Sequence, residues 1–353
     1  MFGLEYSLTP RDVIEADYVG SHGIKLVVSA LNLNQLPPAD LALGSSALTA
    51  ATANPFFGLS PMTGSACGLA GATVPAYQLM LPMPEFCDSV TNAKDLTAFS
   101  FYDALDVKYR HRLSNNLTIL GTYTRGKALD DTIGGSSFYA FYGETVRNNY
   151  NLAQEKSVAY ADQPNGAVVS YIYQLPVGRG KWIGQNWGKA TDEAFGGWQV
   201  AGDTSFREGL PMGISANLNA SSVYGGGQHA LVVGNPNTPG TIAGCVGPTA
   251  LRNITHWYNP CAFQAAPAGT FGNAPRYFSN LRTAPYYDSD ISLSKSTNIT
   301  DSLRMQFRAE FFNAFNHVNL GPSTNTAPGS GNAGSITYAD IPRQIQFAAK
   351  FYW

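Results

Sequence analysis

The sequence predicts an all-β protein whose antiparallel strands form a transmembrane β-barrel, and three observations predict it. At the carboxyl end, Ile345, Phe347, Ala349, Phe351 and Trp353 alternate with residues that include glutamines and a lysine. This period of two gives a strand one apolar and one polar face, and about ten residues suffice for a tilted strand to cross a bilayer. Only 13% of the residues are charged, while 12% are aromatic, which suits a lipid-facing surface. Short turns and long loops also alternate along the chain.

The expected strands come in pairs joined by turn residues. They are 2–8, 12–20, 103–113, 116–127, 165–175, 197–207, 285–296, 302–313 and 343–353. Thr9-Pro10-Arg11 and Ser114-Asn115 join the first two pairs, a Gly-rich connection joins the third, and a polar turn containing Asn298 and Asp301 joins the fourth. A further strand within 151–160 would bring the total to about ten, and single-chain bacterial barrels have even strand numbers.

Long, irregular stretches rich in Gly, Pro, Asn, Ser and Thr separate the pairs. They are 21–100, 128–164, 208–284 and 314–342. If Trp353 ends at the periplasmic rim, every short turn falls on that side and every long loop falls outside, as in outer-membrane barrels. The chain has no run of 18 apolar residues and no signal peptide at Met1. For an exported protein, we therefore expect the front of the molecule to be missing.

The four cysteines lie in loop-like segments and form two spaced pairs, Cys67 with Cys87 and Cys245 with Cys261. This spacing favours two local disulfides in an oxidising compartment, with four reduced thiols as the alternative. Cysteines and histidines lack the spacing of a metal site. The net charge of −2 does not predict nucleic-acid binding.

No catalytic, metal-binding or cofactor residues are expected, because no catalytic motif is present, and the chain does not read as an enzyme. The letters of a dinucleotide-binding motif at 329–334 neither follow a strand nor open a helix. The nearest thing to a site is the charged face of the strands. Its residues are Lys108, Arg110, Arg112, Asp203, Arg207, Arg304, Arg308 and Glu310. A cationic side chain on the lipid face would cost roughly 2–4 kcal/mol at the midplane, so we expect this face to line the lumen, where it either holds a plug through salt bridges or keeps the interior hydrated.

Several segments together resemble the carboxyl-terminal barrel of Oar-like TonB-dependent receptors of acidobacteria. They are Tyr18-Val-Gly-Ser-His-Gly23 with Leu31-Asn-Leu-Asn-Gln35, residues 168–181, Gly196-Gly-Trp-Gln-Val200, and residues 307–317 before the last strand. The resemblance covers nearly the whole chain. Complete members of that family carry a signal peptide, often a β-sandwich, a plug domain and a 22-stranded barrel.

The resemblance therefore implies that residues 1–353 are the last ten or so strands of a receptor in the cell outer membrane, without its plug and first strands. Implied partners are outer-membrane lipid, the barrel-assembly machinery, the missing strands and plug, and the TonB complex acting through that plug. Phe347, Phe351 and Trp353 are expected to form the carboxyl-terminal assembly signal. Ligand contacts are expected in 21–100 and 208–284. The sequence does not distinguish an oligosaccharide, a siderophore and a peptide as the ligand.

Two other hypotheses belong to different classes of protein. A self-contained ten-stranded barrel, acting as an adhesin or porin, would require residues 2–8 to pair with 344–353. A secreted β-sandwich would bind carbohydrate through exposed aromatic residues such as Trp182, Trp187 and Trp257.

Overall fold

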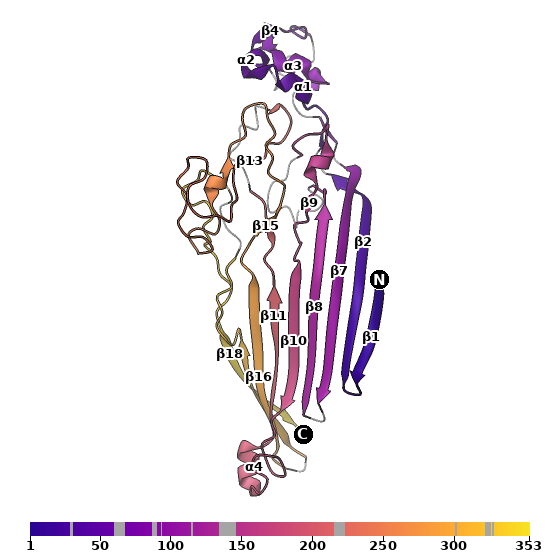
Figure 1. Ribbon diagram of the computed structural model, residues 1–353, viewed down its shortest axis with the longest axis vertical. Helices are drawn as coiled ribbons and strands as arrows, with labels where there is room; N and C mark the ends of the chain where they lie inside the picture. Colours follow the sequence, from indigo (N-terminus) through magenta and orange to yellow (C-terminus); the bar gives the residue numbers. More distant parts are fainter. Residues whose placement is uncertain are drawn as a thin grey trace.

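One long antiparallel sheet forms the body of the protein (Figure 1). The computed structural model describes residues 1–28, 31–59, 68–86, 90–92, 94–113, 116–133, 146–214, 223–300, 302–321, 326 and 328–353. The strands, in their order across the sheet, are β1 (Phe2–Thr9), β2 (Asp12–Val28), β7 (Asp95–Leu113), β8 (Leu117–Asp130), β10 (Asn165–Gln174), β11 (Trp198–Arg207), β16 (Tyr286–Asn298), β17 (Arg304–Phe312) and β18 (Gln344–Tyr352). Each of these nine strands pairs with the next of the nine along the chain, which is the arrangement that consecutive hairpins produce.

The predicted strand pairs are confirmed, with two differences. Residues 151–160 do not form a full strand, because η2 (Leu152–Glu155) occupies its first half and only β9 (Ser157–Val158) pairs with β8. Strands β2 and β7 are longer than expected, because they stay paired past Gly23 and Ser100 with two shifts of register. Glycine and polar residues hide this extension from a search for apolar alternation.

The two ends of the sheet differ in their connections, as the sequence predicts. Short connections join β1 to β2, β7 to β8 and β16 to β17 at one end, which also holds the carboxyl terminus (Figure 1). The connection from β10 to β11 lies at the same end and contains α4 (Lys189–Phe195). The long segments gather at the other end (Figure 1). We call these two ends the short-turn end and the long-loop end.

The long segments are not irregular throughout, which corrects the sequence-based expectation. The segment before β7 contains β3 (Leu31–Asn32), α1 (Pro38–Leu41), α2 (Gly44–Leu48), β4 (Ala51–Ala53), β5 (Thr73–Pro75), α3 (Ala76–Met80), η1 (Pro84–Phe86) and β6 (Thr91–Asn92). The segment from 208 to 285 contains β12 (Pro211–Met212), β13 (Leu231–Val232), η4 (Pro260–Ala262), β14 (Phe263–Gln264) and β15 (Phe278–Arg282). The described parts of this second segment are called the 208–285 loop below.

The apolar core lies in these loops rather than in the sheet. Tyr258, Ala262 and Leu281 of the 208–285 loop are fully buried in its largest cluster, together with Ile336 from the loop before β18. On the sheet, by contrast, large apolar side chains are exposed: Leu4 is 66% and Phe347 is 70% accessible. A water-soluble protein seldom exposes so continuous an apolar surface.

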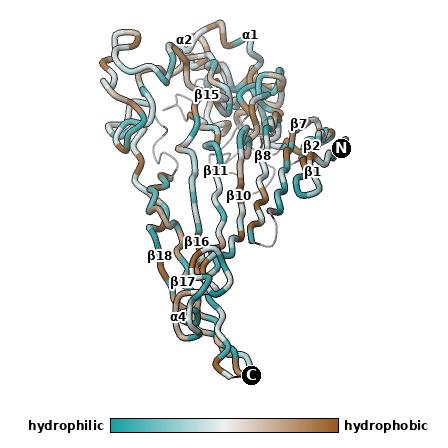
Figure 2. Tube along the Cα trace, turned by 60° about the horizontal axis from the view of Figure 1, so that its bottom comes forward, coloured by the Kyte–Doolittle hydropathy of each residue, from teal (hydrophilic) through white to brown (hydrophobic). Residues whose placement is uncertain are grey.

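Register divides the sheet into two chemically different faces. Leu4, Ala16, Val107, Tyr123 and Ala167 form one row of directly paired residues across five strands. This apolar face alternates with a polar face along each strand, as the colours of β8, β10 and β11 show (Figure 2). No helix of the described residues is long and apolar enough to cross a membrane.

Near its short-turn end, the apolar face carries polar groups that are partnered by one another. Asp12 pairs with His111 across β2 and β7. The hydroxyl of Tyr109 donates to the same carboxylate at 2.7 Å. Neighbouring polar side chains can satisfy one another at the edge of an apolar band, where water is close.

Candidate functional site

The register brings the charged residues expected at the lumen onto one face, the polar face. One row of paired residues crosses six strands and consists of Arg112, Thr118, Ile172, Ala201, Ser292 and Glu310. A second row crosses five strands and consists of Arg110, Leu120, Ser170, Asp203 and Asp290. Lys108 and Arg207 occupy the same face through their pairing with Thr122 and Gly166. Arg304 and Arg308 follow by alternation from Glu310 along β17.

Some of these charges are partnered on the polar face itself. Lys108 Nζ lies 2.9 Å from Glu15 Oε2, and Arg308 Nη1 lies 3.2 Å from Glu310 Oε1. The guanidinium of Arg304 lies over the ring of Tyr352, 4.6 Å from its centroid. These pairs are partly exposed, so each contributes little to stability.

Other charges on the polar face remain available. No ion pair is found for Arg110, Arg112 or Asp203 among the described residues. Asp203 lies directly opposite Asp290, and like charges at paired positions repel each other. The face therefore offers cationic and anionic groups to a partner that would approach it.

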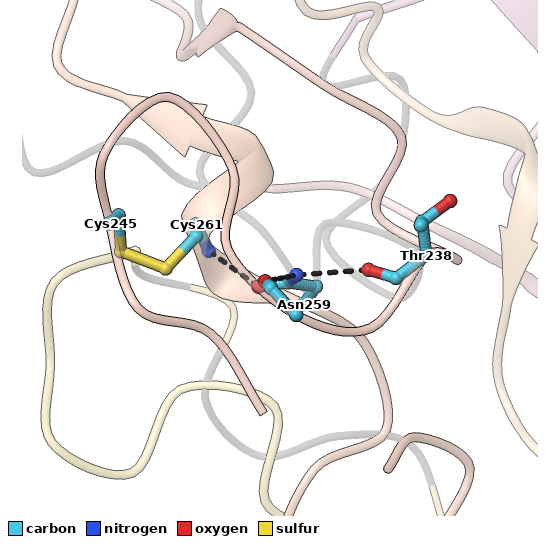
Figure 3. The surroundings of a disulfide bond; sticks show 5 residues. Thr238, Cys245, Asn259 and Cys261 are labelled. Carbon is cyan, nitrogen blue, oxygen red and sulfur yellow. Dashed lines mark hydrogen bonds between the residues drawn. A yellow bond between two sulfur atoms is a disulfide. The ribbon is translucent and has the colours of Figure 1, made fainter. Parts of the chain in front are cut away.

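A disulfide joins Cys245 to Cys261 in the 208–285 loop, with the two Cα atoms 5.5 Å apart (Figure 3). Cys67 and Cys87 lie outside the described residues. Next to the disulfide, Asn259 is fully buried and accepts a hydrogen bond from the backbone N–H of Cys261. Its side-chain amide donates to the carbonyl oxygen of Thr238 at 2.9 Å (Figure 3) and to that of Gly240 at 2.8 Å. The Asn259 side chain therefore holds the segment of Thr238 and Gly240 beside the segment that carries Cys261.

Two arginines fasten the 208–285 loop to other parts of the protein, and the first of them reaches the sheet. Arg276 is 7% exposed and donates to the backbone carbonyls of Asp130, Thr132 and Glu155 at 2.8, 2.7 and 2.6 Å. It also pairs with the Asp130 carboxylate at the end of β8. The planar guanidinium has five donors in a fixed geometry, which suits several acceptors at once.

The second arginine, Arg282, makes a similar junction. It pairs with Asp162, which is 2% exposed, and donates to the carbonyl oxygens of Asp162 and Gly209 at 2.7 and 3.1 Å. Glu208 lies 3.8 Å from its Nε. Because Asp162 is 120 residues away along the chain, this arginine joins the 208–285 loop to the segment before β10.

A buried carboxylate and an imidazole meet behind Arg276. Glu155 is 1% exposed and accepts from the backbone and side chain of Arg147 at 3.0 and 3.2 Å. His229 bonds the carbonyl oxygen of Ala274 through Nδ1 at 2.9 Å, and its Nε2 lies 4.0 Å from Glu155 Oε2. Burial, and then the positive charge of Arg147, holds the pKa of His229 below its ordinary value, although the charge of Glu155 acts in the other direction.

Sequence reasoning missed this network. Charged residues in Gly- and Pro-rich segments are ordinarily solvated, and the partners of Arg276 lie 121 to 146 residues away. The one available signal is the scarcity of charged residues in the chain, 13%. In such a chain, each arginine in a loop is a stronger candidate for a structural contact. Among the described residues, no group of His, Cys, Asp and Glu side chains could hold a metal ion.

Most of the remaining predicted residues lie on the surface, and Trp257 is the exception. Phe347 and Phe351 are exposed on the apolar face of β18, and Trp353 is 94% exposed at its end. Trp182 is exposed at the short-turn end, whereas Trp257 is buried in the core of the 208–285 loop. Trp257 donates to the carbonyl oxygen of Arg282 at 2.6 Å, so its role is structural.

A sheet with an exposed apolar face, a charged opposite face, short turns at one end and long loops at the other defines an outer-membrane β-barrel protein. The sequence model of the family described as "Outer membrane beta barrel domain" matches residues 1–346. The chain belongs to this family, and its place is the outer membrane. Comparison with the curated proteins finds no match.

Solved structures of outer-membrane proteins share low similarity with the chain. The ferric-catecholate import receptor Fiu from Escherichia coli K12 is 11% identical, with 99% of this chain and 34% of Fiu covered and a TM-score of 0.34. FpvA of P. aeruginosa, in a structure with bound pyoverdine, is 10% identical, with 99% of this chain and 32% of FpvA covered and a TM-score of 0.31. The monoaromatic hydrocarbon channel TodX is 8% identical, with 99% of this chain and 59% of TodX covered and a TM-score of 0.22. The chain thus spans about a third of the length of the two receptors.

Proposed function

We propose that the chain is the carboxyl-terminal part of the barrel of an Oar-like TonB-dependent receptor, and that it supplies wall and outer loops for the uptake of a large solute. One arrangement carries this proposal: among the described residues, the polar face holds charges of both signs without an ion pair, in a sheet whose two edge strands are each paired on one side. Among the described residues, β1 pairs only with β2 and β18 only with β17. Hydrocarbon does not tolerate unpaired backbone groups, so both edges need further strands.

In this proposal the polar face lines the lumen and the plug of the receptor rests against it. Arg110, Arg112, Asp203 and Asp290 face the plug and hold it through charge pairs. The long-loop end lies outside the cell, and there the 208–285 loop, braced by Arg276 and by its disulfide, gives a solute a firm surface. The TonB complex acts on the plug from the periplasm and releases the solute into the lumen.

The self-contained barrel is the second candidate, and the strand pairing speaks against it. That barrel needs β1 to pair with β18, but among the described residues β1 pairs with β2 alone and β18 with β17 alone, and the two strands lie apart (Figure 1). A β-sandwich is excluded, since the main strands form one sheet of an outer-membrane barrel and not two packed layers.

Conductance distinguishes a plugged receptor from an open porin. The protein is purified from its native outer membrane and inserted into a planar lipid bilayer. A plugged barrel passes little current until urea unfolds the plug, because the barrel itself resists the denaturant. Large, steady channels without urea would contradict the proposal and favour a porin.

A variant links this measurement to the polar face. Asp203→Asn together with Asp290→Asn removes two carboxylates that face the plug, and we expect urea-dependent opening to begin at a lower urea concentration. Ser205→Asn, at the next polar-face position of β11, is the matched control. An unchanged opening threshold in the double variant would contradict a role for these carboxylates in plug retention.

A further inference from the structure

The connection between β10 and β11, residues 175–197, is unusual for the short-turn end. It is much longer than the Thr9–Arg11 turn at the same end, and it exposes large apolar side chains. Trp182 is 85%, Phe195 64% and Ile183 45% accessible. The ring of Trp187 meets that of Phe195 edge to face, with centroids 6.3 Å apart. Such a cluster at the surface marks a contact with something apolar.

The connection is docked on the apolar face of the sheet. Lys295 projects from that face, because it is paired between Trp198 and Phe307. Its ammonium donates to the backbone carbonyl of Glu193 in α4 and lies 5.6 Å from the ring centroid of Trp198. Figures 1 and 2 both show α4 beside the short-turn ends of β11 and β16. The exposed aromatic residues therefore continue the surface that meets lipid.

Cationic residues lie close to these aromatic residues in the sequence. The connection contains Arg179, Lys181 and Lys189, against Asp192 and Glu193. The Asp192 carboxylate accepts from the backbone N–H of Arg179 at 2.5 Å, and Glu193 lies 3.9 Å from Lys189. No ion pair is found for the Arg179 and Lys181 side chains among the described residues.

We propose that the 175–197 connection is an interfacial anchor that binds anionic phospholipid in the leaflet on the short-turn side. Trp182, Ile183 and Phe195 enter the boundary between headgroups and acyl chains, where amphipathic aromatic side chains are favoured. Arg179 and Lys181 bind the phosphates beside them. The anchor depends on the membrane location of the barrel and not on the uptake function.

Spin-label accessibility tests the depth of the anchor. The whole protein carries a label at Trp182→Cys, with Cys67 and Cys87 changed to Ser, and is reconstituted into vesicles of phosphatidylethanolamine and phosphatidylglycerol. Oxygen, which is soluble in lipid, should collide with the label more than a water-soluble nickel chelate does, as for a label at Phe351→Cys on the apolar face. A label at Ser302→Cys, in the neighbouring turn, should favour the nickel chelate. Equal behaviour at positions 182 and 302 would overturn the proposal.

Lipid retention tests the headgroup contact. Arg179→Gln together with Lys181→Gln should weaken phosphatidylglycerol binding roughly thirtyfold, because one cation near an anionic surface contributes about fivefold. Lys25→Gln with Lys94→Gln, two exposed lysines at the long-loop end, is the matched control and should bind phosphatidylglycerol normally. Native mass spectrometry counts the retained lipids, and heat-modifiable migration on a gel verifies that each variant is folded. Equal phosphatidylglycerol retention by both double variants would contradict the assignment of the phosphate contact.

Discussion

Arg276 and Asp130 join the 208–285 loop to the end of β8 across 146 residues of chain. Arg276→Met keeps the length of the side chain but leaves the Asp130 carboxylate and three carbonyl oxygens, of which that of Glu155 is buried, without their donor. Removing one partner of a buried ion pair costs about 3–5 kcal/mol. We expect the loop to open while the sheet stays intact, and limited proteolysis of the folded protein measures this as faster cleavage within 208–285.

The matched control is Arg11→Met, since Arg11 is exposed in the turn between β1 and β2. Its cleavage rate should equal that of the unmodified protein. If Arg276→Met were cleaved no faster than this control, the guanidinium would not be what fastens the loop.

The disulfide should contribute separately to the stability of the same loop. Cys245 and Cys261 are 16 residues apart, and closing a loop of that size stabilises the folded state by about 3 kcal/mol. Changing both cysteines to Ser should lower the thermal stability of the loop, measured by hydrogen exchange of its amides. The amides of β8 and β10 in the same sample serve as the internal control, because the sheet does not contain the cross-link. Equal loss of protection in those strands would refute a local role.

His229 predicts how the stability of the loop depends on pH. Its pKa in the folded loop lies below the ordinary value of 6.5, so the unfolded loop binds the proton more tightly. The loop should be most stable above pH 6.5 and should weaken as the pH falls through that value. Burial raises the pKa of Asp131 above its ordinary value of 3.8. The stability that this carboxyl contributes therefore changes with pH in the opposite direction, because it is lost as the pH rises above the ordinary carboxyl value.

His229→Gln retains a donor for the Ala274 carbonyl and removes the titrating group. Hydrogen exchange of the loop, corrected for intrinsic rates, should then change less between pH 7.5 and pH 5.5 than it does with histidine, as linkage requires. An identical pH dependence in the two proteins would show that another group is responsible.

The sheet was predictable because its physics is local. Apolar and polar residues alternate along a strand such as 302–313 because its two faces meet different surroundings. A shift of the register by one residue would put Arg308 into lipid. The polar-face positions of Lys108, Asp203 and Glu310 follow from the same alternation. Turn residues such as Pro10 mark where strands end.

The loops were not predictable because their stability comes from contacts distant in sequence. Nothing near Arg276 indicates that its acceptors are Asp130 and Thr132, and nothing in 151–160 indicates that Glu155 is needed in a buried network rather than in a strand. Lys295 is a similar case, because its partner, the carbonyl oxygen of Glu193, lies 102 residues away in the 175–197 connection.

Two adjacent residues of β18 test the central claim, that one face of this sheet meets lipid and the other does not. Phe347 is 70% exposed on the apolar face and stacks on Phe307, with ring centroids 6.2 Å apart, while Gln346 is bonded to Glu310 on the polar face. Phe347→Arg places a cation in hydrocarbon at a cost of about 2–4 kcal/mol near the midplane, whereas Gln346→Arg places it beside a carboxylate. The measurement is the amount of folded, heat-modifiable protein in the outer membrane. We expect a large loss for Phe347→Arg and normal amounts for Gln346→Arg, and equal amounts of the two variants would contradict the account.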